Sequence, residues 1–359
     1  MAKGHWDAEP LSFGVFDQIE SDGRPISDIY EEHIQLMEYA DKAGFYCYHV
    51  SEHHGTPLSL SISPNIILSA AAQRTQKIRL AALVYCLPYY EPYRLANEIN
   101  MLDHLTGGRI EVGVGRGISP IEAAFFGIPT VEESRAIYRE TLDIMLEAFT
   151  SGELNYQGKY HSYAKFPLMV PSMQKPYPPL WFPSSNTESV PFTAKNGFNT
   201  IFNNRFSLNE IESLVSQYKE LWDRHSQEPD RMNGHVASPK LGLSVKVYVA
   251  PTDEEAEREA LPAFRVWGQH ISHLSRQAGG RGEADRENFE AQRANGTLIV
   301  GSPQTVIEQV HRTVRLTGIN YLLSSFAFGD LQPVQYMRSM ELFAKEVIPA
   351  WATSPTSAG

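Results

Sequence analysis

The chain has 359 residues, of which 42% are hydrophobic and 20% charged, so it is long enough and apolar enough to bury a large core. Its formal net charge of -11 argues against a general affinity for nucleic acid or anionic membrane, because both require clustered Lys and Arg. The sequence has neither an apolar run of the roughly 18 residues that span a bilayer nor a signal-peptide core, so we expect a cytoplasmic protein that acts on a small molecule.

β-branched and aromatic runs alternate with helical patterns along the whole chain, which is typical of repeated βα units around a parallel sheet. Strands are expected at residues 11–16, 46–50, 78–85, 110–114, 180–182, 200–202, 243–250 and 319–324. The first helix is expected to bury one face, formed by Ile29, His33, Leu36, Met37 and Ala40. Eight such units predict an α/β fold of the (β/α)8 TIM-barrel type, as a single domain over residues 1–359.

Two segments interrupt this alternation. Residues 152–179 are rich in proline and tyrosine, which favours an excursion or hairpin at the edge of the barrel over a new domain. Residues 265–296 are polar and contain a glycine cluster at 279–282. Long insertions after a barrel strand tend to cover the active mouth, so we predict a mobile lid here, with a surface loop of no catalytic role as the alternative.

The two cysteines, Cys47 and Cys86, lie in apolar segments that we expect to be strands. They lack the CxxC spacing of a redox or zinc motif. Free cysteine is among the residue types most often buried, so the sequence predicts two buried free thiols.

Candidate catalytic residues follow the second strand, because function in such a barrel lies at the carboxyl ends of the strands. These residues are Glu52, His53 and His54. Adjacent residues on an extended segment point apart, and no HxH or HExxH partner is present, so a metal site is disfavoured. An imidazole titrates near neutral pH and can exchange a proton with a reactant, although a structural hydrogen bond is the alternative for each ring.

The fourth strand closes with Gly113-Val114-Gly115-Arg116-Gly117. This is not a dinucleotide-binding fingerprint, which opens the helix of a first βαβ unit and has an acidic residue about 20 positions later. Small residues let a flat ring approach the backbone, and Arg116 offers a planar cation to a phosphate. Close packing of the glycines and a structural salt bridge of Arg116 remain the alternatives.

A second candidate anion site follows the fifth strand, at residues 184–189. Its hydroxyls and free amides at a helix start suit a phosphate, although a plain N-cap uses the same residue types. Arg135, near the start of the helix after the fourth strand, offers a second cation, with an exposed surface position as the alternative.

Together these motifs resemble the flavin-binding half of the bacterial luciferase-like monooxygenases. The most specific block runs from Ser51-Glu52-His53-His54-Gly55 through Pro92-Tyr93-Arg94 to Gly115-Arg116-Gly117, and the resemblance extends over the whole chain. By matching motif, His53 is similar to the family's catalytic histidine, with His54 beside it. Residues that the resemblance places against the flavin are Leu83, Val84, Tyr85, Gly115, Arg116, Arg135, Ser185, Glu188 and Ser189.

The resemblance also implies several finer features of the flavin site. Residues 83–85 occupy the place where the family often has a non-proline cis peptide beneath the isoalloxazine ring. A substrate pocket is expected from Phe16, Glu52, Tyr89, Trp181 and Trp267, with plain core packing as the alternative for the aromatic rings. Two positions depart from true luciferase, whose reactive cysteine is Gly115 here and whose threonine after the Glu-Ser pair falls at Phe192. We therefore expect no light emission.

The activity that the resemblance implies is that of a two-component monooxygenase. Reduced FMN comes from a separate NAD(P)H-flavin reductase, and O2 adds to it to form a C4a-(hydro)peroxyflavin, which oxygenates a carbonyl or electron-rich centre of a small organic substrate. A homodimer is expected through the apolar stretch at residues 62–72. Two alternatives stay open, a deazaflavin-dependent oxidoreductase that transfers hydride and a non-catalytic subunit that stabilises a catalytic partner.

Overall fold

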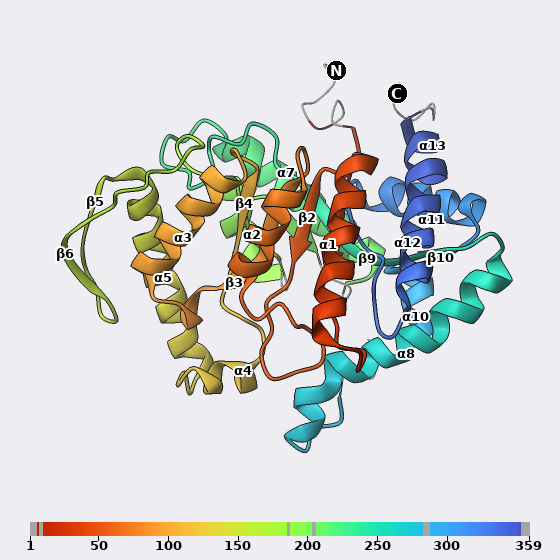
Figure 1. Cartoon of the computed structure of the whole chain (residues 1–359). Helices are drawn as coiled ribbons and strands as arrows, with labels where there is room; N and C mark the ends of the chain where they lie inside the picture. The colour runs from red at the N-terminus through yellow and green to blue at the C-terminus, as the bar shows by residue number, and fades with distance from the viewer. Residues whose placement is uncertain (1–5, 7–9, 185–186, 203–205, 283–287, 353–359) are drawn as a thin grey trace.

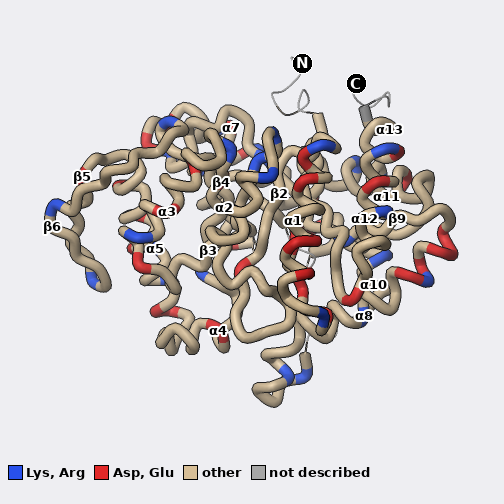
Figure 2. The backbone as a smooth tube through the Cα atoms, viewed as in Figure 1, with Lys and Arg blue, Asp and Glu red and all other residues tan. Residues whose placement is uncertain are grey.

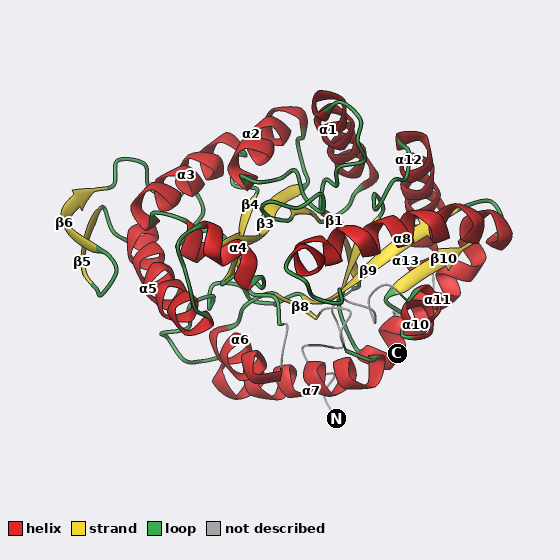
Figure 3. Ribbon diagram, turned by 90° about the horizontal axis from the view of Figure 1, so that it is seen from below, coloured by secondary structure: helices red, strands yellow, loops and turns green. Residues whose placement is uncertain are grey.

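The computed structural model describes residue 6 and residues 10–184, 187–202, 206–282 and 288–352. Parallel strands form the centre of the molecule. On one side of β1 the strands follow in the order β1-β2-β3-β4-β7, and on its other side in the order β1-β11-β9-β8. Isolated bridges from Trp181 to Asn199 and from Ser184 to Phe202 join β7 to β8. The described strands thus form a ring of eight, as the alternation in the sequence predicts (Figure 3). The bounds of the eight strands are β1 Ser12–Asp17, β2 Cys47–Val50, β3 Arg79–Cys86, β4 Ile110–Gly115, β7 Leu180–Trp181, β8 Thr200–Phe202, β9 Leu241–Val249 and β11 Tyr321–Ser325.

One further parallel strand was not expected from the sequence. β10 (Leu298–Gly301) pairs with the second half of β9, from Lys246 to Val249. The first half of β9 pairs with β8, so β10 extends the same edge beyond the ring. The sequence pattern does not predict β10, because an apolar run of four residues is too short for its periodicity to distinguish a strand from the start of a helix.

Helices surround the ring and pack on the outer faces of the strands (Figures 1 and 3). The outer helices are α1 Ile26–Ala43, α2 Pro64–Arg74, α3 Pro92–Leu105, α5 Val131–Thr150, α6 Val190–Asn196, α7 Leu208–His225, α11 Pro303–Thr317 and α12 Pro333–Leu342, which a π turn (Phe343–Val347) connects to α13 Ile348–Ala352. Acidic and basic residues are interspersed along these helices (Figure 2). Among the described helices, none is long and apolar enough to cross a membrane.

The buried face of α1 is the one that its sequence pattern predicts. All five expected residues of that face, from Ile29 to Ala40, are buried. His33 on this face would be costly to bury alone, and its Nδ1 lies 2.6 Å from Asp17 Oδ2 at the end of β1. The Tyr48 hydroxyl donates to the same carboxylate oxygen at 2.5 Å. This buried polar cluster connects α1 with β1 and β2.

The interior of the ring is packed rather than hollow. Its apolar cluster contains Leu83, Trp181, Ile201, Tyr321 and Leu323. Toward the amino ends of the strands, the buried carboxylate of Glu111 accepts hydrogen bonds from Trp181 Nε1, Arg79 Nε and the Tyr46 hydroxyl. Both cysteines are buried and free, which confirms the prediction from their spacing. Because this interior is filled, and because sites in such barrels lie at the carboxyl ends of the strands, the candidate site is at these ends, which we call the mouth.

Two excursions leave this frame. Residues 153–167 form an antiparallel hairpin, β5 (Glu153–Gln157) and β6 (Ser162–Pro167), which projects from the side of the barrel beside α3 and α5 (Figure 1). Residues 265–277, expected at the start of a lid, continue helix α8 (Asp253–Gln277), and α10 (Phe289–Ala294) follows. Residues 283–287 lie outside the described residues. Short α4 (Pro120–Phe125) and one half of α8 lie inside the ring of outer helices (Figure 3). The lid function of residues 265–296 stays a prediction.

Candidate active site

Two buried carboxylates hold the histidines that follow β2. Glu122 Oε1 lies 3.1 Å from His53 Nδ1, and Glu122 Oε2 accepts the backbone N–H of His54 at 2.9 Å. Glu52 Oε1 lies 2.9 Å from His54 Nε2, and Glu52 Oε2 accepts the backbone N–H of Cys86 at 2.9 Å. Each carboxylate therefore fixes one imidazole and one backbone amide, and Glu52 also accepts a hydrogen bond from the Tyr90 hydroxyl.

Glu122 is the residue of this cluster that sequence reasoning missed. It lies on α4, whose N-cap Ser119 accepts the backbone N–H of Glu122 at 3.2 Å. The spacing Ser119-x-x-Glu122 is that of a capping box, in which the acidic side chain returns to the cap. Here the carboxylate instead reaches the histidines, 68 and 69 positions earlier in the chain, and no local pattern predicts such a contact.

Aromatic rings cover one side of His54. Tyr89 and Phe126 stack with their centroids 4.3 Å apart, and the His54 ring meets Phe126 edge-on at 4.8 Å and Tyr89 at 5.7 Å. Burial, with the nearby Cys86 thiol and Glu122, raises the pKa of Tyr89, so this phenol stays protonated. Tyr89 was expected in the pocket, whereas Phe126, just after α4, was not.

The glycines of β4 let the strand lie directly against β3. A Cβ at Gly113 would lie 2.3 Å from the Ala82 carbonyl oxygen, and one at Gly115 would lie 2.6 Å from Val84 Cγ2. The peptide bond between Leu83 and Val84 is cis, as the resemblance implies. Close packing therefore accounts for these glycines, and Val84 fills the space that a cysteine at position 115 would need.

Arg116 and Arg135 are two cations of the mouth that form no ion pair among the described residues, although the Glu132 carboxylate acts on Arg116 electrostatically. Arg116 is half-buried at the end of β4, and Arg135 is exposed near the start of α5. Burial lowers the pKa of the Arg116 guanidinium, and the positive charge of Arg135 lowers it further. Neither side chain has a hydrogen bond or ion pair within the part of the chain that the structure describes. The Ser134 hydroxyl donates to the Arg116 carbonyl at 3.3 Å and connects the two segments, so the arrangement suits a bound anion such as a phosphate.

The other expected anion contacts follow β7, the strand next to β4 in the ring. Glu188 is exposed and Ser189 half-buried in a 3-10 turn (Thr187–Ser189) that leads into α6. Ser185 lies outside the described residues. The binding roles of all three stay predictions.

Comparison with known proteins settles the family. Residues 11–321 match the family model described as luciferase-like monooxygenase. The chain belongs to this family. It is 35% identical over 323 residues to the uncharacterized protein y4wF of Sinorhizobium fredii, with 89% of this chain and 92% of that protein covered.

Solved structures of similar fold hold different cofactors. The monooxygenase RslO1 from Streptomyces bottropensis has a TM-score of 0.80 at 22% identity, with 95% of this chain and 100% of that chain covered. The oxygenating constituent of 3,6-diketocamphane monooxygenase from Pseudomonas putida, in complex with FMN, has a TM-score of 0.75 at 24% identity, covering 94% and 98%. An F420-dependent secondary alcohol dehydrogenase has a TM-score of 0.69 at 20% identity, covering 95% and 99%.

The remaining expected pocket residues of this luciferase-like monooxygenase lie in two places. Phe16, half-buried, packs against the inner apolar cluster, and Trp181 is fully buried within it, so Trp181 belongs to the closed interior. Trp267, on α8, donates from Nε1 to Gln18 Oε1 at 3.0 Å, beyond the end of β1. Sequence reasoning missed the buried Lys246, whose Nζ lies 3.9 Å from the Trp267 ring centroid.

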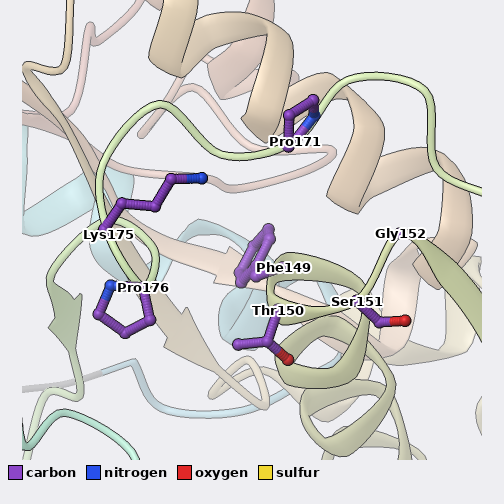
Figure 4. A pocket seen from close by; sticks show the side chains of 7 residues that line it. All are labelled: Phe149, Thr150, Ser151, Gly152, Pro171, Lys175 and Pro176. Carbon is purple, nitrogen blue, oxygen red and sulfur yellow. The ribbon is translucent and has the colours of Figure 1, made fainter.

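The hollow shown in Figure 4 is separate from this site. It has a volume of about 250 Å³ and lies between the end of α5, at Phe149 and Thr150, and the loop from Pro171 to Pro176. Arg135 is at the other end of the 20-residue helix α5, which is about 30 Å long. The Lys175 ammonium in this hollow donates to the Ser172 carbonyl at 2.8 Å and thus closes the loop on itself.

Proposed function

We propose that the protein is the oxygenase component of a two-component system that uses reduced FMN and O2. One oxygen atom enters a small organic substrate at a carbonyl or electron-rich centre, and the other leaves as water, with two electrons supplied by the reduced flavin. The observation that carries the proposal is the pair of arginines, Arg116 and Arg135, which form no ion pair or side-chain hydrogen bond among the described residues and lie at the mouth that also holds His53. FMN in the similar 3,6-diketocamphane monooxygenase structure supports the assignment.

Each part of the mouth has a role in this proposal. Arg116 and Arg135 hold the FMN phosphate, with Ser185, Glu188 and Ser189 as further contacts. The β3 segment from Leu83 to Tyr85 and Gly115 of β4 support the flavin ring. Reduced FMN, when bound, supplies the electrons that activate oxygen. His53 and His54 hold or move protons at the reacting centre. Phe16, Glu52, Tyr89 and Trp267 shape the pocket and exclude water, and Trp181 supports the pocket from the packed interior.

The proposal includes two partners. A separate NAD(P)H-flavin reductase supplies reduced FMN, which agrees with the similar camphane enzyme being the oxygenating constituent of its monooxygenase. A second copy of the chain covers α2 and α3, where Ile66 is 74% exposed and Met101 55%. Exposed apolar side chains on neighbouring helices favour such a homodimer interface, and we place the dimer in the cytoplasm.

Hydride transfer with a deazaflavin is the second candidate function. It is favoured by the similar fold of the F420-dependent alcohol dehydrogenase. In that case the same mouth holds a deazaflavin and no oxygen is incorporated into product. A non-catalytic subunit is the third candidate, and the presence of His53, Arg116 and Arg135 together in one chain speaks against it.

The test is an anaerobic titration of the purified protein with reduced FMN, followed by rapid mixing with oxygenated buffer while absorbance is recorded. We expect saturable binding and then an oxygen-dependent transient distinct from both reduced and oxidised flavin. A parallel titration with reduced F420 is the control. Saturable F420 binding without FMN binding would replace the proposal with hydride transfer, and binding of neither cofactor would favour the non-catalytic subunit.

A further inference from the structure

We propose that Glu122 is a positioning residue that fixes the tautomer of His53, with the proton on Nδ1 and the lone pair on Nε2. Glu52 imposes the opposite tautomer on His54. The mouth would then present one imidazole nitrogen of defined character from each ring, Nε2 of His53 and Nδ1 of His54. The catalytic importance of this arrangement rests on the function proposed above, whereas the tautomers themselves do not.

The two carboxylates can only accept hydrogen bonds when they are ionised. An ionised carboxylate donates no hydrogen bond, so a ring nitrogen that bonds to it must carry the proton. Glu122 Oε1 lies 3.1 Å from His53 Nδ1, and Glu52 Oε1 lies 2.9 Å from His54 Nε2. The two contacts use different nitrogens, so they select opposite tautomers for adjacent residues.

Both carboxylates, Glu122 and Glu52, are held in place by burial and by hydrogen bonds. The Glu122 and Glu52 side chains are only 6% and 1% exposed. Their second oxygens accept the backbone N–H groups of His54 and Cys86, each at 2.9 Å. A backbone amide always donates, so these bonds hold each carboxylate in one rotamer and leave one oxygen for the imidazole.

Glu122 leaves the Nε2 nitrogen of His53 open. The His53 side chain is 17% exposed, and its Nε2 has no hydrogen-bond partner among the described residues. The ring is therefore anchored at one nitrogen and accessible at the other. This is the arrangement by which a carboxylate orients a catalytic imidazole, because the accessible nitrogen keeps its lone pair for a proton.

The arrangement makes a specific prediction for Glu122→Gln. A glutamine side chain has one acceptor oxygen and one NH2 donor in place of two acceptor oxygens. Because the His54 backbone N–H can only donate, it should take the amide oxygen, and the NH2 would then face His53 Nδ1. His53 should respond by moving its proton to Nε2. Glu52→Gln is the matched control, since it leaves the His53–Glu122 contact intact and should leave His53 unchanged. It should reverse His54, because the Cys86 backbone N–H takes the amide oxygen, while the Tyr90 hydroxyl, which also bonds to Glu52, can rotate to either amide group.

The experiment is NMR of the full chain labelled with ¹⁵N-histidine, at a pH where the imidazoles are neutral, with His53→Gln and His54→Gln used for assignment. We expect His53 protonated on Nδ1 and His54 on Nε2 in the wild type. Glu122→Gln should reverse His53 alone, and Glu52→Gln should reverse His54 alone. In a titration with reduced FMN, Glu122→Gln should change the flavin Kd less than about twofold, because Glu122 contacts the two histidines and neither Arg116 nor Arg135.

Two results would overturn the inference: a wild-type His53 protonated on Nε2, or a His53 tautomer unchanged by Glu122→Gln. The wild-type measurement decides the matter even if a variant fails to fold. Because the tautomers are measured without flavin, failure of the oxygenase function leaves this test intact. Normal tautomers with no response to oxygen would reject the proposed function alone.

Discussion

The histidines of the packed layers and those of the mouth differ in what surrounds their two ring nitrogens. His33 lies between α1 and the sheet with Nδ1 against Asp17, and His49 faces the ring interior with Nε2 2.9 Å from the Tyr321 hydroxyl. Burial lowers the pKa of His49 to about 3, so this ring stays neutral. His53 and His54 also bond to buried groups, but their side chains remain 17% and 18% exposed.

Anchoring and burial therefore have separate consequences for an imidazole. His49, His53 and His54 lie within six positions of one another, on β2 and just after it. β2 ends at Val50, so the His49 ring lies in the packed interior of the barrel, whereas His53 and His54 lie beyond the strand and reach the mouth. An anchored but accessible imidazole can exchange a proton, whereas a fully buried one contributes to packing and stability.

The largest expected effect comes from exchanging each ring for an amide of similar size. We expect His53→Gln to lower the rate of product formation about 10²- to 10⁴-fold, the usual contribution of a general acid or base. The free energy of unfolding of the His53→Gln variant should differ little from that of the wild type. His49→Gln is the matched variant in the packed interior and should lower that free energy by about 1–3 kcal/mol, because a buried hydrogen bond is disturbed.

Turnover assays and urea unfolding of both variants check this pair of expectations. The comparison fails if His49→Gln reduces turnover as much as His53→Gln while both proteins remain folded. It also fails if His53→Gln destabilises the protein as strongly as His49→Gln, since His53 would then be a structural residue.

A second prediction concerns the buried pair in the outer layer. Asp17→Asn should lower the free energy of unfolding by about 3–5 kcal/mol, because it leaves His33 buried without its anionic partner. The Tyr48 hydroxyl would lose its charged acceptor as well. Urea unfolding near neutral pH measures the loss. A change below about 1 kcal/mol would mean that this layer tolerates an unpaired imidazole.

The same pair should give the wild type a recognisable pH dependence. Burial opposes both charges, but attraction and hydrogen bonding between the partners outweigh it, which lowers the pKa of Asp17 from 3.8 and raises that of His33 from 6.5. The Asp17 contribution is present above pH 3.8 and is lost as pH falls through its lower folded pKa. The His33 contribution is present below pH 6.5 and is lost as pH rises through its higher folded pKa. Asp17→Asn should remove the second loss, which unfolding measured across that window checks.

The sequence predicts those features of the structure that are set by a local sequence pattern, and it misses those that are set by contacts between separate segments. The ring strands and the buried face of α1 follow from hydrophobic periodicity, and the cis bond before Val84 followed from the family resemblance. β10 and the long C-terminal half of α8 were missed because their patterns are short or polar. Glu122 reaches the two histidines and Lys246 reaches the Trp267 ring through tertiary contacts between separate segments, and no spacing along one chain encodes such contacts.

The smallest expected effect concerns the Arg116 guanidinium at the mouth. Arg116→Gln should weaken binding of reduced FMN about 10- to 100-fold, because hydrogen bonds to charged groups contribute about 1.5–3 kcal/mol each. Binding of reduced riboflavin, which lacks the phosphate, should change little. Arg139 is exposed one turn beyond Arg135 on α5, so Arg139→Gln is a matched control that should leave both affinities unchanged.

Equilibrium titrations of the two flavins with both variants separate a phosphate site from general surface charge. Equal losses for FMN in Arg116→Gln and Arg139→Gln would mean that the positive charge acts at long range, and such losses should disappear at high salt. A loss confined to Arg116→Gln, and to the phosphorylated flavin, would persist at high salt because the half-buried guanidinium contacts its ligand directly. The guanidinium at the end of β4 would then be what distinguishes this mouth from the packed interior below it, where the Arg79 guanidinium is already paired with Glu111.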